Sequence, residues 1–113
     1  MADRKNEYKK EIYISMTKGN CINAWKLHKK NTIELYCIKG SCRVVIADIY
    51  KNIVFDNQIK EFSVHKLIIP SMMWFAFSTM NSEDGVGILN STRSEFDEQE
   101  LERKPVSFIN VDW

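Results

Sequence analysis

Apolar and polar residues alternate over short stretches of this chain, the period-two pattern of strands that bury one face. Turn residues separate these stretches, among them Gly19-Asn20, Lys39-Gly40-Ser41 and Asp56-Asn57. Strands are expected at residues 11–16, 25–30, 32–38, 42–49, 53–55, 60–64, 66–69, 74–79 and 85–89. Short strands repeated every 8–12 residues or so are typical of a β-sandwich or β-barrel. The pattern therefore predicts an all-β fold.

Helical signals are confined to the C-terminal part of the chain. Residues 94–102 begin with Ser94, a good N-cap, and carry acidic residues that suit the start of a helix. The tail that follows contains Phe108 and Trp113, and an ordered tail would remove both aromatic rings from water. We expect at most one short C-terminal helix, followed by an ordered tail.

Two neighbouring predicted strands each combine an apolar face with a face of titratable side chains. In the first strand, Trp25 and Leu27 form the apolar face. Its other face holds Lys26, His28 and Lys30. In the second strand the apolar face is Ile33, Leu35 and Cys37, and the other face is Thr32, Glu34 and Tyr36. An open sheet would leave the titratable faces in water, whereas a barrel could bring Lys26, His28, Glu34 and Tyr36 together in its lumen. The pattern leaves both alternatives open.

Length and composition limit the class of protein. The 113 residues, 13.3 kDa in mass, suit a single domain spanning 1–113, and the 44% of hydrophobic residues and 27% of charged residues are ordinary for a globular protein. No apolar run approaches the roughly 18–20 residues of a membrane helix, and the charged start of the chain lacks the core of a signal peptide. We therefore expect a cytoplasmic protein with no membrane partner.

Charge and cysteine content exclude further classes. The formal net charge of +1 gives no general support for nucleic-acid binding, so no nucleic-acid partner is expected. Residues 1–30 nevertheless hold eight Lys and Arg against three acidic residues, a basic region that either receives an anion such as phosphate or is simply solvated. Three cysteines without a CxxC pair indicate neither a disulfide scaffold nor a zinc ribbon.

Three segments, in order and at matching spacing, resemble cupin proteins. Gly19, residues 25–30, Glu34 and Gly40 resemble the first cupin motif, in which a Gly is followed by His-x-His, Glu and Gly. Residues 69–77 resemble the second motif, Pro-x-Gly-x-x-His, and residues 90–100 resemble the N-x-x-T-x-x-Y-D-x-x-D-E stretch of sugar-nucleotide cupins. The likeness is greatest to dTDP-4-dehydrorhamnose 3,5-epimerase-like proteins and to the WxcM-like dTDP-4-keto-6-deoxyhexose 3,4-ketoisomerases. It implies a cupin jelly-roll β-barrel.

Two departures from the cupin pattern concern metal binding. A metal-binding cupin uses two His and a Glu from the first motif and a His from the second, but here Lys26 and Phe75 stand at two of those positions. Neither side chain offers a lone pair at neutral pH, which leaves only His28 and Glu34 as ligands. We expect no bound metal, and the resemblance implies no cofactor.

The resemblance and the residue chemistry together assign roles. A neutral imidazole suits proton abstraction next to a keto group, so His28 is the expected base, Lys26 the stabiliser of the enolate and Tyr36 a possible acid. Glu34 is expected to pair with Lys26 or His28. The expected substrate-binding residues are Lys30, Glu34, Trp74 and Asn90. Solvated His and Lys side chains and a packed Trp are the alternative interpretations.

These observations support a metal-independent epimerase or ketoisomerase that acts on a nucleotide-linked sugar, with a dTDP-sugar as the expected partner, in cell-surface polysaccharide or lipopolysaccharide synthesis. One alternative is a non-catalytic cupin that binds a sugar or nucleotide sugar, and another is a small assembly domain with a filled barrel. Ligand binding separates the third hypothesis from the other two, and proton exchange separates the first from the second. Residues 8–16 alternate as an edge strand would, and with the resemblance this predicts a homodimer.

Overall fold

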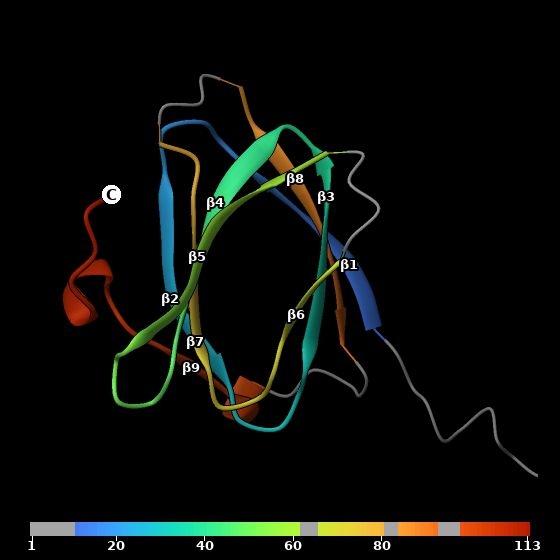
Figure 1. The fold of residues 1–113 in the computed structure, drawn as a ribbon. Helices are drawn as coiled ribbons and strands as arrows, with labels where there is room; N and C mark the ends of the chain where they lie inside the picture. Colours follow the sequence, from blue (N-terminus) through green and yellow to red (C-terminus); the bar gives the residue numbers. More distant parts are fainter. Residues whose placement is uncertain (1–10, 62–65, 81–83, 93–97) are drawn as a thin grey trace, which may run out of the picture.

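The computed structural model describes residues 11–61, 66–80, 84–92 and 98–113, which form two facing antiparallel sheets (Figure 1). In the four-stranded sheet the order is β1 (Glu11–Thr17), β8 (Val86–Thr92), β3 (Ile33–Lys39) and β6 (Leu67–Ile69). In the five-stranded sheet it is β5 (Ile53–Lys60), β4 (Ser41–Ala47), β7 (Trp74–Ser78), β2 (Ile22–His28) and β9 (Leu101–Arg103). This is the strand order of a jelly roll, so the predicted all-β barrel is confirmed.

The strand boundaries differ from the expectation in several places. The strand expected at 25–30 is β2, which ends at His28, so Lys29 and Lys30 lie beyond it. Asp56 and Asn57 were expected to form a turn, but both lie within β5, opposite Val45 and Val44 of β4. The guanidinium of Arg43 donates two hydrogen bonds of 2.7 Å to the Asp56 carboxylate across these strands, which satisfies an acidic side chain inside a strand. The expected strand at 60–64 lies partly outside the described residues, and β9 was not expected at all.

Alternation within the strands builds an apolar core between the two sheets. This inner core contains Ile33, Leu35, Cys42, Val44, Ile46, Ile69, Phe75, Phe77, Val86 and Ile88. Gly40 closes the β3–β4 hairpin with φ of +74°, and a Cβ there would lie 3.1 Å from the Gly85 carbonyl oxygen, so a glycine is required. All three cysteines are free thiols, and burial raises the pKa of Cys42 to about 12.

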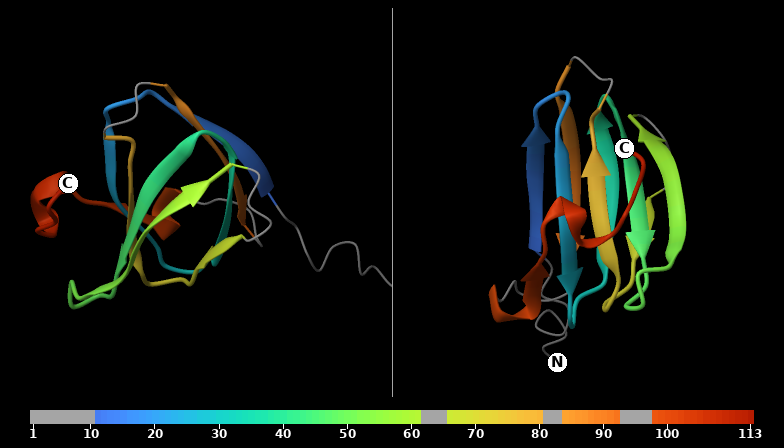
Figure 2. Two further views of the ribbon diagram at one scale, coloured as in Figure 1. Left: turned by 45° about the horizontal axis from the view of Figure 1, so that its top comes forward. Right: turned by 90° about the vertical axis from the view of Figure 1, so that its left-hand side faces the viewer.

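A second core covers the outer face of the five-stranded sheet. Trp25, Leu27 and Trp74 are each at most 5% exposed there. The C-terminal segment lies across this face of the sheet (Figure 2, right). Its Ile109 is buried in the same cluster. The Trp25 and Trp113 ring centroids are 5.9 Å apart, and Phe108 meets Trp74 edge to face at 4.9 Å. The expected ordered tail is therefore confirmed, and it buries one face of β2.

Helical structure in the described part of the chain consists of two 3₁₀ turns, η2 (Glu98–Glu100) and η3 (Val106–Phe108). Of the helix expected over 94–102, residues 94–97 lie outside the described residues. Residues 98–100 form the η2 turn, and residues 101–102 belong to the strand β9. In the described residues no helix has the length and apolar character needed to cross a membrane.

Candidate active site

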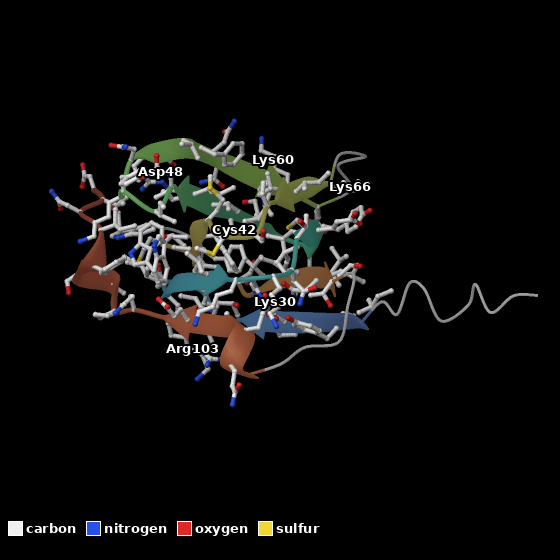
Figure 3. The ribbon with its side chains drawn as sticks, turned by 90° about the horizontal axis from the view of Figure 1, so that it is seen from below. Lys30, Cys42, Asp48, Lys60, Lys66 and Arg103 are labelled. Carbon is white, nitrogen blue, oxygen red and sulfur yellow. The ribbon has the colours of Figure 1, made fainter. Side chains whose placement is uncertain are left out.

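A cavity of about 360 Å³ lies between the sheets, on the side of the barrel formed by the edge strands β1 and β9. Apolar side chains of the inner core, including Phe75 and Ile88, form part of its lining. The polar and charged part of the lining is Tyr13, Ser15 and Thr17 from β1, Asn23, Lys26 and His28 from β2, Asn90 from β8 and Arg103 from β9. Figure 3 labels Arg103 on β9 and Lys30 in the turn after β2.

The imidazole of His28 is held by a carboxylate from a distant part of the chain. His28 Nδ1 lies 2.9 Å from Oε2 of Glu100, and the two residues are only 5% and 3% exposed. A carboxylate accepts hydrogen bonds and does not donate when ionised, so Nδ1 carries the proton and donates it. In the neutral form of the ring this hydrogen bond leaves the lone pair on Nε2.

Glu100 is itself fixed by the backbone of the turn after β2. Its Oε1 accepts hydrogen bonds from the amides of Lys30, at 3.0 Å, and Asn31, at 2.8 Å. Burial raises the pKa of the Glu100 carboxyl, but the hydrogen bonds from His28 and the two amides outweigh it and hold the pKa below its usual range. Glu100 therefore remains an anion that orients the ring of His28.

Phe75 occupies the second-motif position at which the cupin pattern has a His. Its ring stacks on His28 with centroids 5.9 Å apart and planes inclined by 6°. An apolar ring thus lies against the imidazole where a metal-binding cupin would present a ligand. Among the described residues, no three His, Cys, Asp or Glu side chains are grouped so that they could hold a metal ion.

Lys26 and Arg103 bring positive charge to the cavity. They are direct partners across the β2–β9 pair, and both line the cavity. Burial, with a smaller effect from the Arg103 charge, lowers the pKa of Lys26. No Asp or Glu is among the described residues that line the cavity, so its charge suits an anionic ligand.

An irregularity in β2 adds Asn23 to the site. Asn23 and Lys26 are three positions apart and would point to opposite faces of a regular strand. The register with β7 shifts between these two residues, and both line the cavity. On the facing sheet, Asn90 donates from Nδ2 to Ser15 Oγ at 3.1 Å, which orients its amide at the cavity wall.

The structure brings together three of the residues predicted from sequence, Lys26, His28 and Asn90, and places the others outside the cavity lining. Glu34 and Tyr36 lie on the face of β3 opposite to Ile33 and Leu35, which point inward. The expected pairing of Glu34 with Lys26 or His28 is wrong, because Glu34 faces outward and meets Lys66 Nζ at 3.5 Å.

Lys30 and Trp74 also lie away from the cavity lining. Lys30 is in the exposed turn after β2, where its backbone amide, not its ammonium, contributes to the site through Glu100. Trp74 packs beneath Phe108 in the outer core. The binding roles expected for Lys30, Glu34 and Trp74, and the catalytic role of Tyr36, stay predictions.

Sequence reasoning missed Glu100, Tyr13 and Arg103. Glu100 belongs to the 90–100 stretch that resembles sugar-nucleotide cupins, and its position at the end of that stretch was the available signal. Tyr13 occupies the same face of β1 as Ser15 and Thr17, but alternation alone does not say which face of an edge strand meets the cavity. Arg103 carried no signal, because β9 itself was not expected.

Similar folds occur in solved structures of sugar-nucleotide enzymes. A dTDP sugar isomerase from Desulfovibrio desulfuricans is 24% identical, with a TM-score of 0.76 over 91% of this chain and 70% of that one. A dTDP-4-dehydrorhamnose 3,5-epimerase from Elizabethkingia anophelis is 12% identical, with a TM-score of 0.74 over 91% and 61%. A 3,4-ketoisomerase from Helicobacter canadensis is 23% identical, with a TM-score of 0.72 over 83% and 68%. At these identities the likeness establishes the cupin-like fold.

The family comparison covers almost the whole sequence. No curated protein matches the chain. The family model described as WxcM-like, C-terminal (FdtA) matches residues 3–113, which include every residue of the cavity described above. The chain therefore belongs to the WxcM-like, C-terminal family.

Proposed function

We propose that this protein binds a nucleotide-linked keto sugar in the cavity and moves a proton on the carbon next to the keto group, as an epimerase or a ketoisomerase. The observation that carries the proposal is the buried pair of His28 and Glu100 at a cavity lined by cations. The family match and the fold shared with dTDP-sugar isomerases, epimerases and ketoisomerases support the same substrate class.

The base in this proposal is Nε2 of His28. Glu100 keeps the proton on Nδ1 and stabilises the imidazolium that forms when Nε2 takes a proton from substrate. The stacked ring of Phe75 limits rotation of the imidazole and excludes water from one of its faces. Positioned general bases of this kind contribute about 10²–10⁴-fold to a rate.

Positive charge would stabilise the enolate that follows proton removal. Lys26 lies two residues before His28 on the same face of β2, and Arg103 lies beside Lys26 on β9. Cations next to a developing oxyanion, in a site shielded from water, lower the barrier. The same two cations also suit the diphosphate of a nucleotide sugar.

Tyr13 is better located than Tyr36 to act as the acid. It lines the cavity from β1, on the sheet opposite to His28, whereas Tyr36 does not line it. A phenol on the wall facing the base can return a proton to the other face of the same carbon. We therefore propose Tyr13 as the acid in place of Tyr36.

Deuterium exchange tests the proposal directly. A dTDP-linked 4-keto-6-deoxyhexose is incubated with the protein in D₂O, and its ring protons are followed by NMR. Loss of a proton signal next to the keto group, at a rate proportional to protein concentration, is expected. A protein that binds the sugar nucleotide in a thermal-shift assay but incorporates no deuterium would not be an epimerase or ketoisomerase.

The second candidate, a non-catalytic cupin that binds a sugar nucleotide, would account for that outcome. The presence of Lys26 and Phe75 at positions where the cupin motifs have His favours this second candidate. A filled barrel without a ligand site, the remaining alternative, is disfavoured by the cavity of about 360 Å³ between the sheets.

The setting of the reaction is proposed from the substrate class. Nucleotide sugars are precursors for cell-surface polysaccharides such as lipopolysaccharide, so we place the protein in the cytoplasm, in the supply of such a precursor. We also propose a homodimer. Ile12, Ile14 and Met16 of the edge strand β1 are 55–63% exposed on the outer face of the four-stranded sheet, where Ile38 and Ile68 are exposed as well. A second copy would cover both this face and the edge.

A further inference from the structure

Lys26 is an unusual lysine for a cavity wall. It is half-buried, and among the described residues its ammonium has neither a hydrogen-bond partner nor a carboxylate in ion-pair contact. The titratable and charged groups that share the cavity with it are His28 on β2, Arg103 on β9 and Tyr13 on β1. None of the three is a carboxylate, so no acidic side chain among the described residues of the cavity lining pairs with the ammonium of Lys26.

These surroundings make the protonated ammonium of Lys26 less favourable than it is in water. Burial lowers the pKa of Lys26, and the adjacent Arg103 lowers it further. A desolvated lysine next to a second cation is the arrangement that activates an amine for attack on a carbonyl. Arg103 cannot take this part, because its guanidinium stays protonated.

We propose that Lys26 is a covalent catalyst, whose Nζ forms an imine with the keto carbon of the sugar while His28 removes the neighbouring proton. The inference rests on the proposed function and assigns Lys26 a chemical step in place of a purely electrostatic one. Lys26 and His28 lie two positions apart on β2 and both line the cavity. One sugar ring bound there can therefore contact both side chains.

The step balances with water and one proton from solvent, which is returned when the imine is hydrolysed. Neutral Nζ attacks the keto carbon, the carbonyl oxygen takes up a proton, and loss of water gives an iminium. His28 Nε2 then takes the proton from the adjacent carbon, and the C–H electron pair forms a carbon–carbon double bond as the C=N electrons move to nitrogen. Reprotonation of that carbon restores the iminium, and addition of water releases the ketone and the free amine. The positively charged nitrogen of the iminium accepts the electron pair released by proton removal. A separate cation to stabilise an enolate oxygen is therefore not needed.

This chemistry also distinguishes between the two reactions of the proposed function. When the proton returns to the opposite face of the same carbon, from Tyr13, the product is an epimer whose imine water still hydrolyses. When the keto group instead moves to the neighbouring carbon, the nitrogen remains on the original carbon as an amine that water does not release. Covalent catalysis by Lys26 therefore favours epimerisation over ketoisomerisation.

Borohydride trapping tests the imine. The full-length protein is incubated with a dTDP-linked 4-keto-6-deoxyhexose, reduced with sodium cyanoborohydride and analysed by intact mass and peptide mapping. The expected adduct adds the mass of the sugar nucleotide less one oxygen, and it maps to Lys26. Lys26→Arg keeps a cation but has no nucleophilic amine, so it is expected to give no adduct and to exchange deuterium at least about 10²-fold more slowly.

Lys29→Arg is the matched control. Lys29 is one of the nearest lysines in sequence, it is half-exposed, and it pairs with Glu102 at 3.8 Å outside the cavity. This variant is expected to be trapped and to exchange as the wild type does. Circular dichroism and the Tm of Lys26→Arg check its fold, and the mapping on wild-type protein does not depend on any variant.

The outcomes separate the two proposals. Deuterium exchange by the wild type without an adduct, an adduct on another lysine, or near-normal exchange by folded Lys26→Arg each overturns the imine and leaves the proposed function standing. If the wild type shows no deuterium exchange and forms no adduct, both the imine and the proposed function are overturned. An adduct on Lys26 without exchange supports the imine and overturns the isomerase function.

Discussion

Replacing Glu100 by Gln keeps the size of the side chain and removes its charge. The hydrogen bonds of Glu100 predict how this change affects His28. Oε1 accepts from the amides of Lys30 and Asn31, and Oε2 accepts from Nδ1 of His28. Gln has one oxygen and one NH₂ group for these three donors. Turning the NH₂ toward the amides would leave two buried donors unpaired, at a cost of about 1–3 kcal/mol each. The oxygen is therefore expected to stay at the Oε1 position.

The NH₂ group of the introduced Gln side chain then faces Nδ1 of His28, which must accept, so the ring proton moves to Nε2. The base nitrogen of the proposed mechanism is blocked while the fold is kept. The wrong histidine tautomer in a catalytic triad slows turnover by about 10⁴-fold, and loss of a general base by about 10²–10⁴-fold. We expect deuterium exchange by Glu100→Gln to slow by about 10²–10⁴-fold, which is about 2.7–5.4 kcal/mol of activation free energy.

Stability should change far less than the rate. A hydrogen bond to a charged group contributes about 1.5–3 kcal/mol and a neutral one about 0.5–1.5 kcal/mol, so the free energy of unfolding is expected to fall by about 1–2 kcal/mol. Because the pKa of Glu100 is lowered in the folded chain, its stabilisation is complete above the unfolded pKa, about 4.3, and is lost as the pH falls through the folded value. The Tm difference between wild type and Glu100→Gln should therefore shrink below about pH 4.

The assay is solvent deuterium incorporation by NMR, with thermal unfolding at several pH values. Glu102→Gln is the control, because Glu102 is half-exposed on the neighbouring β9 and pairs only with Lys29, at 3.8 Å, among the ion pairs of the described residues. Glu102→Gln should exchange deuterium at the wild-type rate, and its free energy of unfolding should fall by less than about 1 kcal/mol. Exchange by folded Glu100→Gln at the wild-type rate would refute the assignment of the proton to Nδ1 and of the base to Nε2.

Three further predictions use other parts of the molecule. His28→Asn keeps hydrogen bonding but removes the proton acceptor, so deuterium exchange should slow by about 10²–10⁴-fold with little change in sugar-nucleotide affinity by calorimetry; unchanged exchange would assign the base to another residue. Elemental analysis of protein purified without a histidine tag should find well under one equivalent of zinc, iron or manganese, and a metal retained after dialysis would contradict this. Light scattering at micromolar concentration should give twice 13.3 kDa, and Ile14→Lys on the exposed face of β1 should give a monomer; a monomeric wild type would exclude the dimer.

The amino-acid sequence alone determined most of the strands and the two faces within each of them. Alternation is local and has a period of two, so it places Lys26 with His28 and Trp25 with Leu27 without knowledge of the fold. The resemblance to cupin motifs then predicted the jelly roll, which the two antiparallel sheets confirm. These features were predictable because each depends on residues within a few positions of one another or on a pattern spread along the chain.

Only the tertiary structure decided which face of each strand points into the barrel. In β3 the apolar face of Ile33 and Leu35 points inward, so Glu34 and Tyr36 lie outside. In β2 the apolar face points outward, because the C-terminal segment, some 80 residues later, covers Trp25 and Leu27. Because the C-terminal segment buries the apolar face of β2, the polar face of this strand can point into the cavity. No local pattern in β2 or β3 predicts this arrangement.

The partners of the site residues also came from the tertiary structure. Glu100 contacts His28 although the two residues are 72 positions apart in the sequence. The sequence contains many other acidic residues and does not indicate which of them pairs with His28. The bulge in β2 turns Asn23 toward Lys26 against simple alternation, and β9 brings Arg103 beside Lys26. Charge–charge and hydrogen-bond partners depend on distance in space, which strand pairing sets and local sequence does not. The sequence by itself therefore determined which side chains this protein offers for chemistry, and the packing of its sheets and tail decided which of them meet.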